Sequence, residues 1–409
     1  MKKTICLVTN WYPTRENPIK GCFFKEQIFA LENSCDFVVF RYQERVKKVP
    51  FKRDCLSIYN REKNSIEYSA IAYIPVWIYI CDFMHTFWIK HFHPDRIMDG
   101  IGKYCSGAGK AIRKKKILKL FRKTKVKVDA FYCIDGQKEA FNTLCLASHY
   151  KKPYIVSEHA PVPWPGTLIA DCNKMAIERA DAFFAISNDK IRQLMLQNIK
   201  LPKTIHLGNM VDETKFTILN KTKPKTKTFI IVAANSYYKN LDMFINVFNR
   251  LCEITEKEFR VLIVGYGANK GYSKNVEEFE DKIRNGVFSS KAELIREVPR
   301  DEMNDMYNRA DAFVMTSIQE GQPVSALEAA CCGLPVFSTR CGGVEDYVGD
   351  DIGMIFDIAD SEGMAQGLKC FLEGKKKYDS VVIRSKTIQR FGRTAFIERF
   401  VSAFDKLCR

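Results

Sequence analysis

Short apolar runs alternate with helix-compatible segments through both halves of the chain. This alternation limits the possible folds, because strands separated by helices pair in parallel and are covered by helices on both faces. The expected strands are Ile5–Val8, Asp36–Phe40, Ala130–Ile134, Tyr154–Ser157, Ala182–Ile186, Phe229–Ala233, Arg260–Val264 and Ala312–Met315. The expected helices include Phe23–Leu31, Gln137–Ser148, Leu241–Cys252 and Glu302–Asn308. The sequence therefore predicts an α/β protein with doubly wound parallel sheets.

A polar segment divides the chain into two halves of similar length. With 409 residues, the chain is longer than one hydrophobic core usually holds. The segment Leu219–Thr228 contains a proline and has no apolar periodicity, which is typical of a domain junction. We therefore expect one domain over residues 1–218 and a second over residues 219–390.

The cysteines and the first residues indicate the cellular compartment of the protein. Fifteen cysteines are scattered without a C-x-x-C pair, and His and Cys never stand at zinc-finger spacing. The strand Ile5–Val8 follows Met1–Thr4 directly, so we expect no secretion signal. Free thiols in a cytoplasmic protein without a structural metal are the prediction.

The stretch Asp311–Val348 predicts a phosphate-binding geometry. The strand Ala312–Met315 is followed by the polar loop Thr316–Gln322. Pro323 suits the first helical position, and Val324–Cys332 is the expected helix. The amides at the start of a helix and its positive dipole end favour an anion. The sequence therefore predicts a phosphate site after this strand.

Two glutamates lie in the segment that predicts the phosphate site, Glu320 in its loop and Glu328 in its helix. Carboxylates do not bind phosphate, but they accept hydrogen bonds from hydroxyl groups, of which sugars carry many. An amphipathic helix with a glutamate near its start is the structural alternative. The flanks E-G, L-E-A-x-x-x-G-L-P-V and G-G-V-E favour the functional interpretation. With them, the stretch resembles the E-x7-E signature of the retaining glycosyltransferases of the GT-B fold, family 4 (glycosyl transferases group 1).

The resemblance implies a fold. GT-B enzymes consist of two Rossmann-like doubly wound domains that face each other across a cleft, with an acceptor domain first and a nucleotide-sugar donor domain second. Their last helix returns to the first domain, a role that we expect for residues 391–409, with Phe396–Cys408 as the helix.

The resemblance also implies the donor site. Glu320 would bind hydroxyls of the donor sugar, and Glu328 would hold the ribose of the nucleotide. Lys239 would bind the diphosphate, while the neutral Asn235 stands where the family usually has an arginine. The backbone that faces the sugar and the diphosphate would be that of Gly321, Gln322, Pro323, Val324 and Ser325.

Two further glycine segments resemble parts of the donor site. The segment Leu262–Gly267 would lie near the nucleotide base, with Gly265 at its turn. A turn role for these glycines is the alternative, because they do not form a G-x-G-x-x-G. The segment Gly342–Glu345 resembles the G-G-x-x-E of the family, near the donor, with a turn as its alternative.

The first half contributes two candidates. Gly21, in G-C-F-F-K-E-Q, would let the backbone approach the donor phosphate, or would simply start a helix. His159, after the strand Tyr154–Ser157, would face the transferred sugar or the acceptor, because ligands bind at the carboxyl edge of such sheets. Asn209 and Asp212 are expected to be mainly structural.

An apolar segment and a basic segment suggest a membrane surface as a partner. The segment Ile71–Ile89 is interrupted by Pro75, Asp82 and His85, so we expect a strand followed by an aromatic helix rather than a membrane span. The segment Lys110–Lys127 contains ten Lys or Arg and no acid. We expect docking on the inner face of a cell membrane through anionic lipid, with ordinary buried and solvated helix faces as the alternative. The residues expected there are Trp77, Trp88, Lys114, Lys115 and Lys116.

The resemblance implies an enzyme that moves a hexose from a nucleoside-diphosphate sugar to a carbohydrate or lipid-linked acceptor. The expected context is the biosynthesis of cell-surface polysaccharide or glycolipid, and neither a metal nor another cofactor is expected. A sugar-nucleotide epimerase or phosphorylase is the nearer alternative, although the two glutamates favour transfer. The net charge of +16 also permits a non-catalytic protein that binds membrane or nucleic acid. Without an RNP-like strand, helix-turn-helix or zinc module, we expect no nucleic-acid partner.

Overall fold

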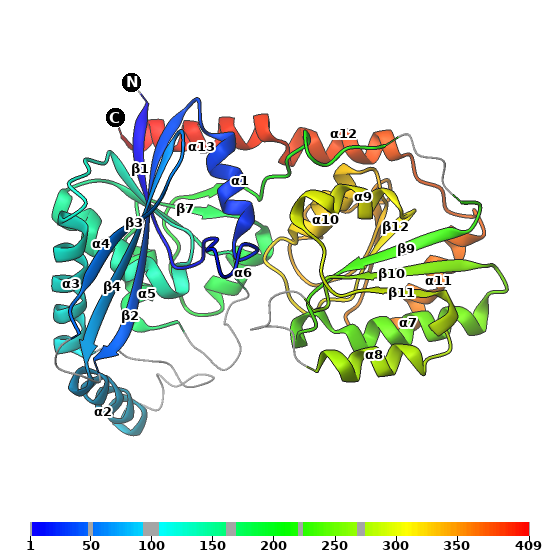
Figure 1. Ribbon diagram of the computed structural model, residues 1–409, viewed down its shortest axis with the longest axis horizontal. Helices are drawn as coiled ribbons and strands as arrows, with labels where there is room; N and C mark the ends of the chain where they lie inside the picture. Colours follow the sequence, from blue (N-terminus) through cyan, green and yellow to red (C-terminus); the bar gives the residue numbers. More distant parts are fainter. Residues whose placement is uncertain are drawn as a thin grey trace. The chain divides into compact units, whose positions relative to one another are not determined.

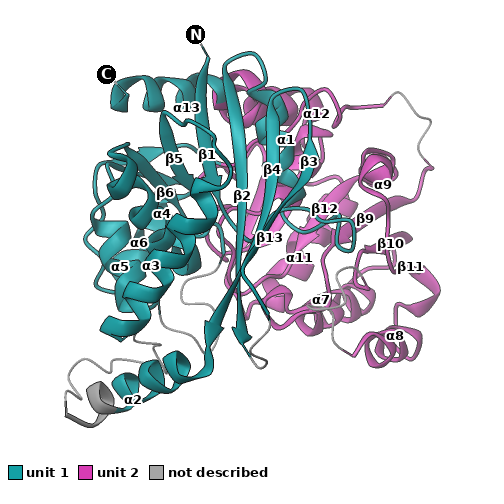
Figure 2. Ribbon diagram, turned by 60° about the vertical axis from the view of Figure 1, so that its left-hand side comes forward, with its two compact units in different colours: residues 1–208, 397–409 teal, residues 209–396 magenta. Residues whose placement is uncertain are grey.

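The computed structural model describes residues 2–47, 52–92, 106–160, 169–219, 224–267 and 275–408. The chain forms two compact units, one of residues 1–208 with 397–409 and one of residues 209–396 (Figure 2). The first unit ends at Gly208 instead of at residue 218. The segment after Gly208 is bonded to the second unit. Thr217 N donates to Asn304 Oδ1 at 2.9 Å, and Leu219 N donates to Asn308 Oδ1 at 2.8 Å.

The first unit contains an eight-stranded sheet in the order β3-β4-β2-β1-β5-β6-β7-β8 (Figure 1). Among the described strands of this sheet, β3 alone runs antiparallel to its neighbour, β4. The strands are β1 (Lys3–Val8), β2 (Cys35–Lys47), β3 (Cys55–Arg61), β4 (Ser65–Pro75), β5 (Ala130–Cys133), β6 (Tyr154–Ser157), β7 (Ala182–Ala185) and β8 (Thr204–His206). The helices are α1 (Cys22–Ala30), α2 (Val76–Phe92), α3 (Gly107–Arg122), α4 (Gly136–Tyr150), α5 (Asp171–Glu178) and α6 (Asn188–Met195).

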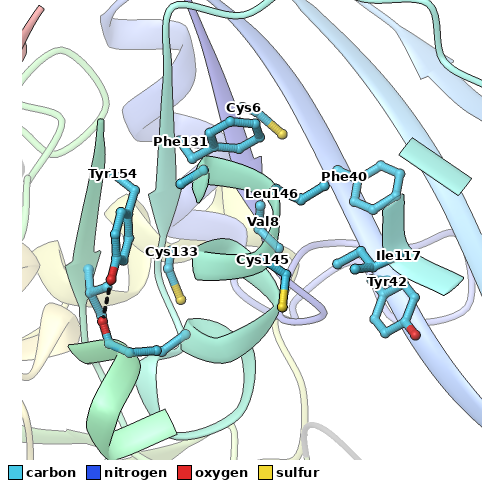
Figure 3. Packing of buried hydrophobic residues seen from close by; sticks show 14 of the residues in the cluster. Cys6, Val8, Phe40, Tyr42, Ile117, Phe131, Cys133, Cys145, Leu146 and Tyr154 are labelled. Carbon is cyan, nitrogen blue, oxygen red and sulfur yellow. Dashed lines mark hydrogen bonds between the residues drawn. The ribbon is translucent and has the colours of Figure 1, made fainter. Parts of the chain in front are cut away.

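Apolar side chains on both faces of this sheet explain its helical cover. On one face Phe40 and Phe131 pack with Ile117 of α3 and Leu146 of α4 in one buried cluster (Figure 3). Within the same cluster the Tyr154 hydroxyl donates to the Ala176 carbonyl at 2.7 Å. On the other face, Phe400 and Phe404 of α13 (Arg393–Leu407) are buried against aromatic side chains of three strands. These are Phe37 of β2, Tyr132 of β5 and Phe184 of β7.

The second unit contains a six-stranded parallel sheet in the order β11-β10-β9-β12-β13-β14. Numbered within the unit, this is the order 3-2-1-4-5-6 of the Rossmann fold. The strands are β9 (Lys227–Val232), β10 (Phe259–Val264), β11 (Ala292–Ile295), β12 (Ala312–Met315), β13 (Val336–Thr339) and β14 (Gly353–Phe356). The expectation of two doubly wound Rossmann-like domains is therefore confirmed.

Helices cover both faces of the second sheet. Side chains of α7, α8 and α11 form one buried cluster with the strands, and side chains of α9, α10 and α12 form another. Figure 1 shows α9 and α10 on one side of this sheet and α7 and α8 on the other. The helices are α7 (Leu241–Ile254), α8 (Val276–Arg284), α9 (Met303–Asn308), α10 (Val324–Cys331), α11 (Ser361–Leu372) and α12 (Ser380–Phe391).

The strand order reverses beside the first strand of each sheet. In the second unit β9 pairs with both β10 and β12, so the loops after β9 and β12 leave neighbouring strands at the same edge. In the first unit β1 lies in the same way between β2 and β5. Ligands of open α/β sheets bind at this reversal, outside the carboxyl ends of the strands.

The observed elements lie close to the expected ones, with some differences. The strands Tyr154–Ser157 and Ala312–Met315 match the expected bounds, and β4 leads into the aromatic helix α2 as expected. Pro323 is not the first helical residue as predicted, because its ψ of 112° leaves it extended and the helix begins at Val324. Strand β3 was missed, since its exposed edge position leaves no apolar run.

Candidate active site

The structure places Lys239 and Glu320 side by side at the strand-order reversal of the second unit. Lys239 ends a 3₁₀ turn, Tyr237–Lys239, that follows β9, and Glu320 lies in the loop after β12. Lys239 Nζ donates to Glu320 Oε1 at 2.6 Å, and Ser317 Oγ donates to the same oxygen at 2.9 Å. Two residues that the sequence singled out from distant segments thus form one charge-assisted pair.

Hydrogen bonds to backbone carbonyls hold these two loops together. Ile318 N donates to the Tyr238 carbonyl at 2.7 Å, and Thr316 Oγ1 donates to the carbonyls of Lys239 and Asn240, each at 3.1 Å. A third segment joins them, because Glu320 N donates to the Cys341 carbonyl at 2.7 Å. The Lys239–Glu320 pair is therefore supported by fixed backbone rather than by two mobile side chains.

The start of α10 has the features of an anion site. Pro323 precedes the helix and makes no side-chain capping bond, so the amides of the first turn have no partner within the helix. Val324 and Ser325 are half-buried in this turn. Gln322 has a structural task, because its Oε1 accepts from Asn209 N at 2.5 Å and its carbonyl from Asn209 Nδ2 at 2.8 Å.

Gly343 packs closely against the loop that carries Glu320. It lies in the glycine pair after β13 with a φ of +73°, and a Cβ there would lie 2.3 Å from the Gly321 carbonyl oxygen. Next to it, Glu345 Oε1 accepts from Gly342 N at 3.2 Å. The G-G-V-E segment therefore packs directly against the E-G-Q-P loop.

Glu328 lies inside α10 and is only 2% exposed. Its Oε2 accepts from the Tyr307 hydroxyl at 2.9 Å, and its Oε1 lies 2.5 Å from an Arg300 nitrogen. Burial, and then the charge of Glu328, raise the pKa of Tyr307, so this tyrosine stays a neutral donor. The structure therefore supplies two partners for Glu328, and its expected contact with ribose stays a prediction.

Arg300 is a cation that the sequence did not single out. Its guanidinium lies 5.0 Å from the centre of the Phe216 ring, besides its contact with Glu328. It lies in the short segment V-P-R-D-E before α9, where no periodicity or spacing marks a basic residue as functional. Only the tertiary structure brings it to Glu328.

The loop after β9, with Asn235, bonds to the loop after β10, which contains Gly265. Asn235 N donates to the Tyr266 carbonyl at 3.1 Å, and Asn235 Nδ2 approaches the Asn275 carbonyl at 3.4 Å. Gly265 has a φ of +82°, and apart from its chain neighbours no atom of the described residues lies within 4 Å of the place a Cβ would take. The turn role of Gly265 is therefore seen directly, and the open space beside it leaves room for its expected role near a base.

In the first unit, His159 is 7% exposed and lies after β6. Its Nε2 is 3.0 Å from Ser157 Oγ, which is itself 3.0 Å from the Tyr132 hydroxyl. The edge of Phe24 packs on its ring with 4.6 Å between centroids. Hydrogen bonds and packing thus orient this imidazole, while its expected role toward a sugar stays a prediction.

Gly21 precedes α1 with a φ of +63°. A Cβ there would lie 2.6 Å from the Trp11 carbonyl oxygen. Left-handed backbone and close approach both require glycine at this position. This accounts for Gly21 structurally, and its approach to a donor phosphate stays a prediction.

Three buried acids follow β5 and β6, and the sequence singled out none of them. Glu158 Oε1 accepts from Ala160 N and its Oε2 from Gln137 N, both at 2.8 Å. Burial, followed by the charge of Asp135, raises the pKa of Glu158 to about 7. Burial also raises the pKa of Asp135, and it raises that of Glu139 to about 8. The sheet-edge argument used for His159 would have found Asp135 and Glu158, because each closely follows a strand.

The expected membrane residues differ in their surroundings. Trp77 on α2 and both Lys114 and Lys115 on α3 are exposed. Lys116 is not an exposed contact residue as expected, because its ammonium lies 2.8 Å from Asp54 Oδ1 and is half-buried. The side chain of Trp88 lies outside the described residues.

Neither a metal cluster nor a membrane span is found in the described part of the chain. There, no three His, Cys, Asp or Glu side chains gather to hold a metal ion. No helix in the ranges that the structure describes combines the length and the apolar character needed to cross a bilayer.

Whole-chain likeness to solved structures fits this architecture. Sucrose-phosphate synthase from Thermosynechococcus elongatus is 14% identical and superposes over 99% of both chains with a TM-score of 0.72. HepE from Anabaena, in complex with UDP-glucose, is 14% identical over 99% of this chain and 100% of its own, with a TM-score of 0.63. At this identity the likeness shows the fold, which is the GT-B fold.

A segment of the second unit matches a family model. Residues 212–387 match the model described as "Glycosyl transferases group 1". A curated relative is the phosphatidylinositol N-acetylglucosaminyltransferase gpi3 subunit of Schizosaccharomyces pombe, 25% identical over 186 residues. The match covers 44% of this chain and 38% of that relative, so the chain spans less than half of its length.

We predict that Gly343→Ala destabilises the second unit more than Gly374→Ala. Both glycines have nearly the same φ, +73° and +74°, but the space beside Gly374 is open. The control should therefore cost only about 1 kcal/mol for the left-handed backbone, and Gly343→Ala about 1–3 kcal/mol more for the collision with Gly321. Urea unfolding of both variants measures the difference, and equal costs would show that this packing is not needed.

We predict that the free energy of unfolding of the first unit falls between about pH 4.5 and about pH 8. The raised pKa of Glu139, about 8, keeps it protonated in the folded state, while the unfolded chain releases the proton above about pH 4.5. The unfolded state then binds fewer protons, so stability is lost as the pH rises. Glu139→Gln should reduce this slope in urea unfolding, whereas Glu398→Gln at an exposed position should leave it unchanged.

Proposed function

We propose that the protein is a retaining glycosyltransferase that moves a hexose from a nucleoside-diphosphate sugar to a carbohydrate or lipid-linked acceptor. The observation that carries the proposal is the Lys239–Glu320 pair, 2.6 Å apart, beside the uncapped start of α10. A cation, free amides and a carboxylate at one sheet edge match the phosphates and hydroxyls of a nucleotide sugar. The expected setting is polysaccharide or glycolipid biosynthesis on the cytoplasmic side of a membrane.

The diphosphate is proposed to bind between Lys239 and the first turn of α10. An ammonium and helix amides both stabilise the negative charge that grows on the phosphate as its bond to the sugar breaks. Asn235 is neutral and brings no positive charge of its own to the diphosphate. Lys239 would therefore supply much of the positive charge that stabilises the leaving diphosphate.

Glu320 is proposed to accept hydrogen bonds from the hydroxyls of the donor sugar. Its Oε1 accepts hydrogen bonds from Lys239 and Ser317. A carboxylate offers about four acceptor positions on its two oxygens. The contacts with Lys239 and Ser317 therefore orient Glu320 while leaving acceptor capacity for the sugar.

Retention of configuration follows if the acceptor attacks from the face that the diphosphate leaves. The acceptor hydroxyl would pass its proton to the leaving phosphate, and the new bond would form where the old one breaks. The oriented imidazole of His159 would contact the transferred sugar or the acceptor. No step in this scheme requires a metal.

Two names among the similar proteins support the substrate classes. HepE is named in complex with UDP-glucose, which is a nucleoside-diphosphate hexose. The relative from Schizosaccharomyces pombe is named for phosphatidylinositol, which is a lipid. A nucleotide sugar as donor and a lipid-linked acceptor are therefore proposed for this chain as well.

We predict that Glu320→Gln lowers kcat about 100-fold or more while the protein stays folded. The amide keeps the shape of the side chain but loses the charge that holds Lys239 and binds sugar hydroxyls strongly. Slow hydrolysis of a panel of nucleotide sugars by the purified protein gives the rate, and thermal unfolding checks the fold. The control Glu302→Gln changes an exposed acid before α9 and should keep full activity. Full turnover by Glu320→Gln would remove its assigned role.

We predict that a chelator leaves donor turnover unchanged. Lys239 and the amides of α10 supply the positive charge that a divalent ion would otherwise bring to the diphosphate. Nucleotide-sugar hydrolysis is measured after dialysis against EDTA and again after Mg²⁺ or Mn²⁺ is added. A rate that disappears with EDTA and returns with the metal would contradict metal independence.

A further inference from the structure

The outer face of α2 is apolar throughout its described length. Among the described side chains of residues 76–87, those that are exposed are all apolar and are 46–67% exposed. They are Val76, Trp77, Ile80, Phe83, Met84 and Phe87. Their spacing of three and four residues places them along one side of the helix. A helix at the surface of a protein usually turns its polar face toward water and its apolar face toward the core.

The inner face of α2 is fixed to the first unit. Ile78 is fully buried in the main cluster of that unit, and Tyr79 packs against it. Asp82 Oδ1 accepts from Ser106 N at 2.8 Å, and Asp82 Oδ2 lies 2.7 Å from an Arg113 nitrogen of α3. The helix is therefore held in place by its polar and buried side, and its apolar side is a surface of the folded unit.

Exposed cations lie on the neighbouring elements. Figures 1 and 2 show α2 next to α3 in the first unit, as the Asp82–Arg113 pair requires. The exposed basic side chains of α3 are Lys114, Lys115, Lys119 and Arg122. Lys52 and Arg53 are exposed beside Asp54, which accepts from Tyr73 N near the end of β4. Among the described residues, the nearby acids pair with cations that are half-buried. Asp54 pairs with Lys116, and Glu44 pairs with Arg113.

We infer that the outer face of α2 and the exposed cations of α3 bind the anionic surface of a lipid bilayer. This rests on the proposed function and names the place where a lipid-linked acceptor would be met. An apolar aromatic face beside basic residues is the pattern of helices that lie in the headgroup region with their apolar side toward the acyl chains. The helix lies on the membrane and does not cross it.

Charge complementarity favours a bilayer over a second copy of this chain as the occupant. A partner of the same sequence would bring the same exposed lysines toward each other, in a chain whose net charge is +16. Like charges at an interface oppose association, whereas anionic headgroups neutralise them. Trp77 and the phenylalanines supply the aromatic groups that favour the boundary between headgroups and acyl chains.

Co-sedimentation of the full chain with vesicles tests the inference without any sugar donor. The protein should sediment with phosphatidylcholine vesicles that contain phosphatidylglycerol, and about tenfold less with phosphatidylcholine alone. Raising the salt from about 0.1 M to about 1 M shortens the screening length from about 10 Å to about 3 Å and should weaken binding. No sedimentation with the anionic vesicles at low salt would overturn the inference.

Matched variants separate the apolar face from the charge. Phe83→Asp should lower binding about tenfold or more, whereas Val287→Asp in the second unit, at a side chain that is also 67% exposed, should not. Trp77→Ser gives a second, milder change in α2. Lys114→Glu with Lys115→Glu should also weaken binding, and Lys257→Glu with Lys377→Glu should weaken it less.

The remaining outcomes also decide the question. Binding that survives both Phe83→Asp and Trp77→Ser would overturn the role of α2. A dimer that Phe83→Asp converts to monomer, without vesicle binding, would show that the face joins two copies. Nucleotide-sugar hydrolysis in solution should be equal in Phe83→Asp and the wild type, so failure of membrane binding and failure of the proposed enzyme are told apart.

Discussion

The candidate site depends on a contact between two loops that leave neighbouring strands. Because β9 and β12 pair although β10 and β11 come between them in sequence, the segments after them meet at one edge. Lys239 and Glu320 lie where the two loops meet, and hydrogen bonds from Ile318 N and Thr316 Oγ1 hold the loops together. The chemistry proposed for the second unit rests on this strand order. A change in the register of either strand would separate the two side chains.

Both sheets carry polar groups at the edge where their strand order reverses, but with different chemistry. The second unit has a charge pair and an uncapped helix start, which suit phosphates and hydroxyls. The first unit has an oriented imidazole beside acids whose pKa burial raises. A neutral carboxyl group donates a hydrogen bond as well as accepting one. The two edges therefore differ in the chemistry that they offer.

Much of the fold was predictable because buried strands leave apolar runs between helices. The strands Tyr154–Ser157 and Ala312–Met315 are examples. Lys239 and Glu320 were predicted from the resemblance to a known family, and they lie in the loops after β9 and β12. The partners of Glu328 were not predictable. Tyr307 and Arg300 come from α9 and the turn before it, and no local pattern links them to α10. Lys116 appeared to be one cation among many until the structure paired it with Asp54.

The Lys239–Glu320 pair has a consequence for anion binding at the proposed site. An incoming anion finds the ammonium already neutralised and must compete with a carboxylate 2.6 Å away. A small monovalent ion such as chloride offers little more than the carboxylate does, whereas a diphosphate brings more charge and several acceptor oxygens. At the proposed site the pair would therefore favour anions of higher valence over monovalent ones.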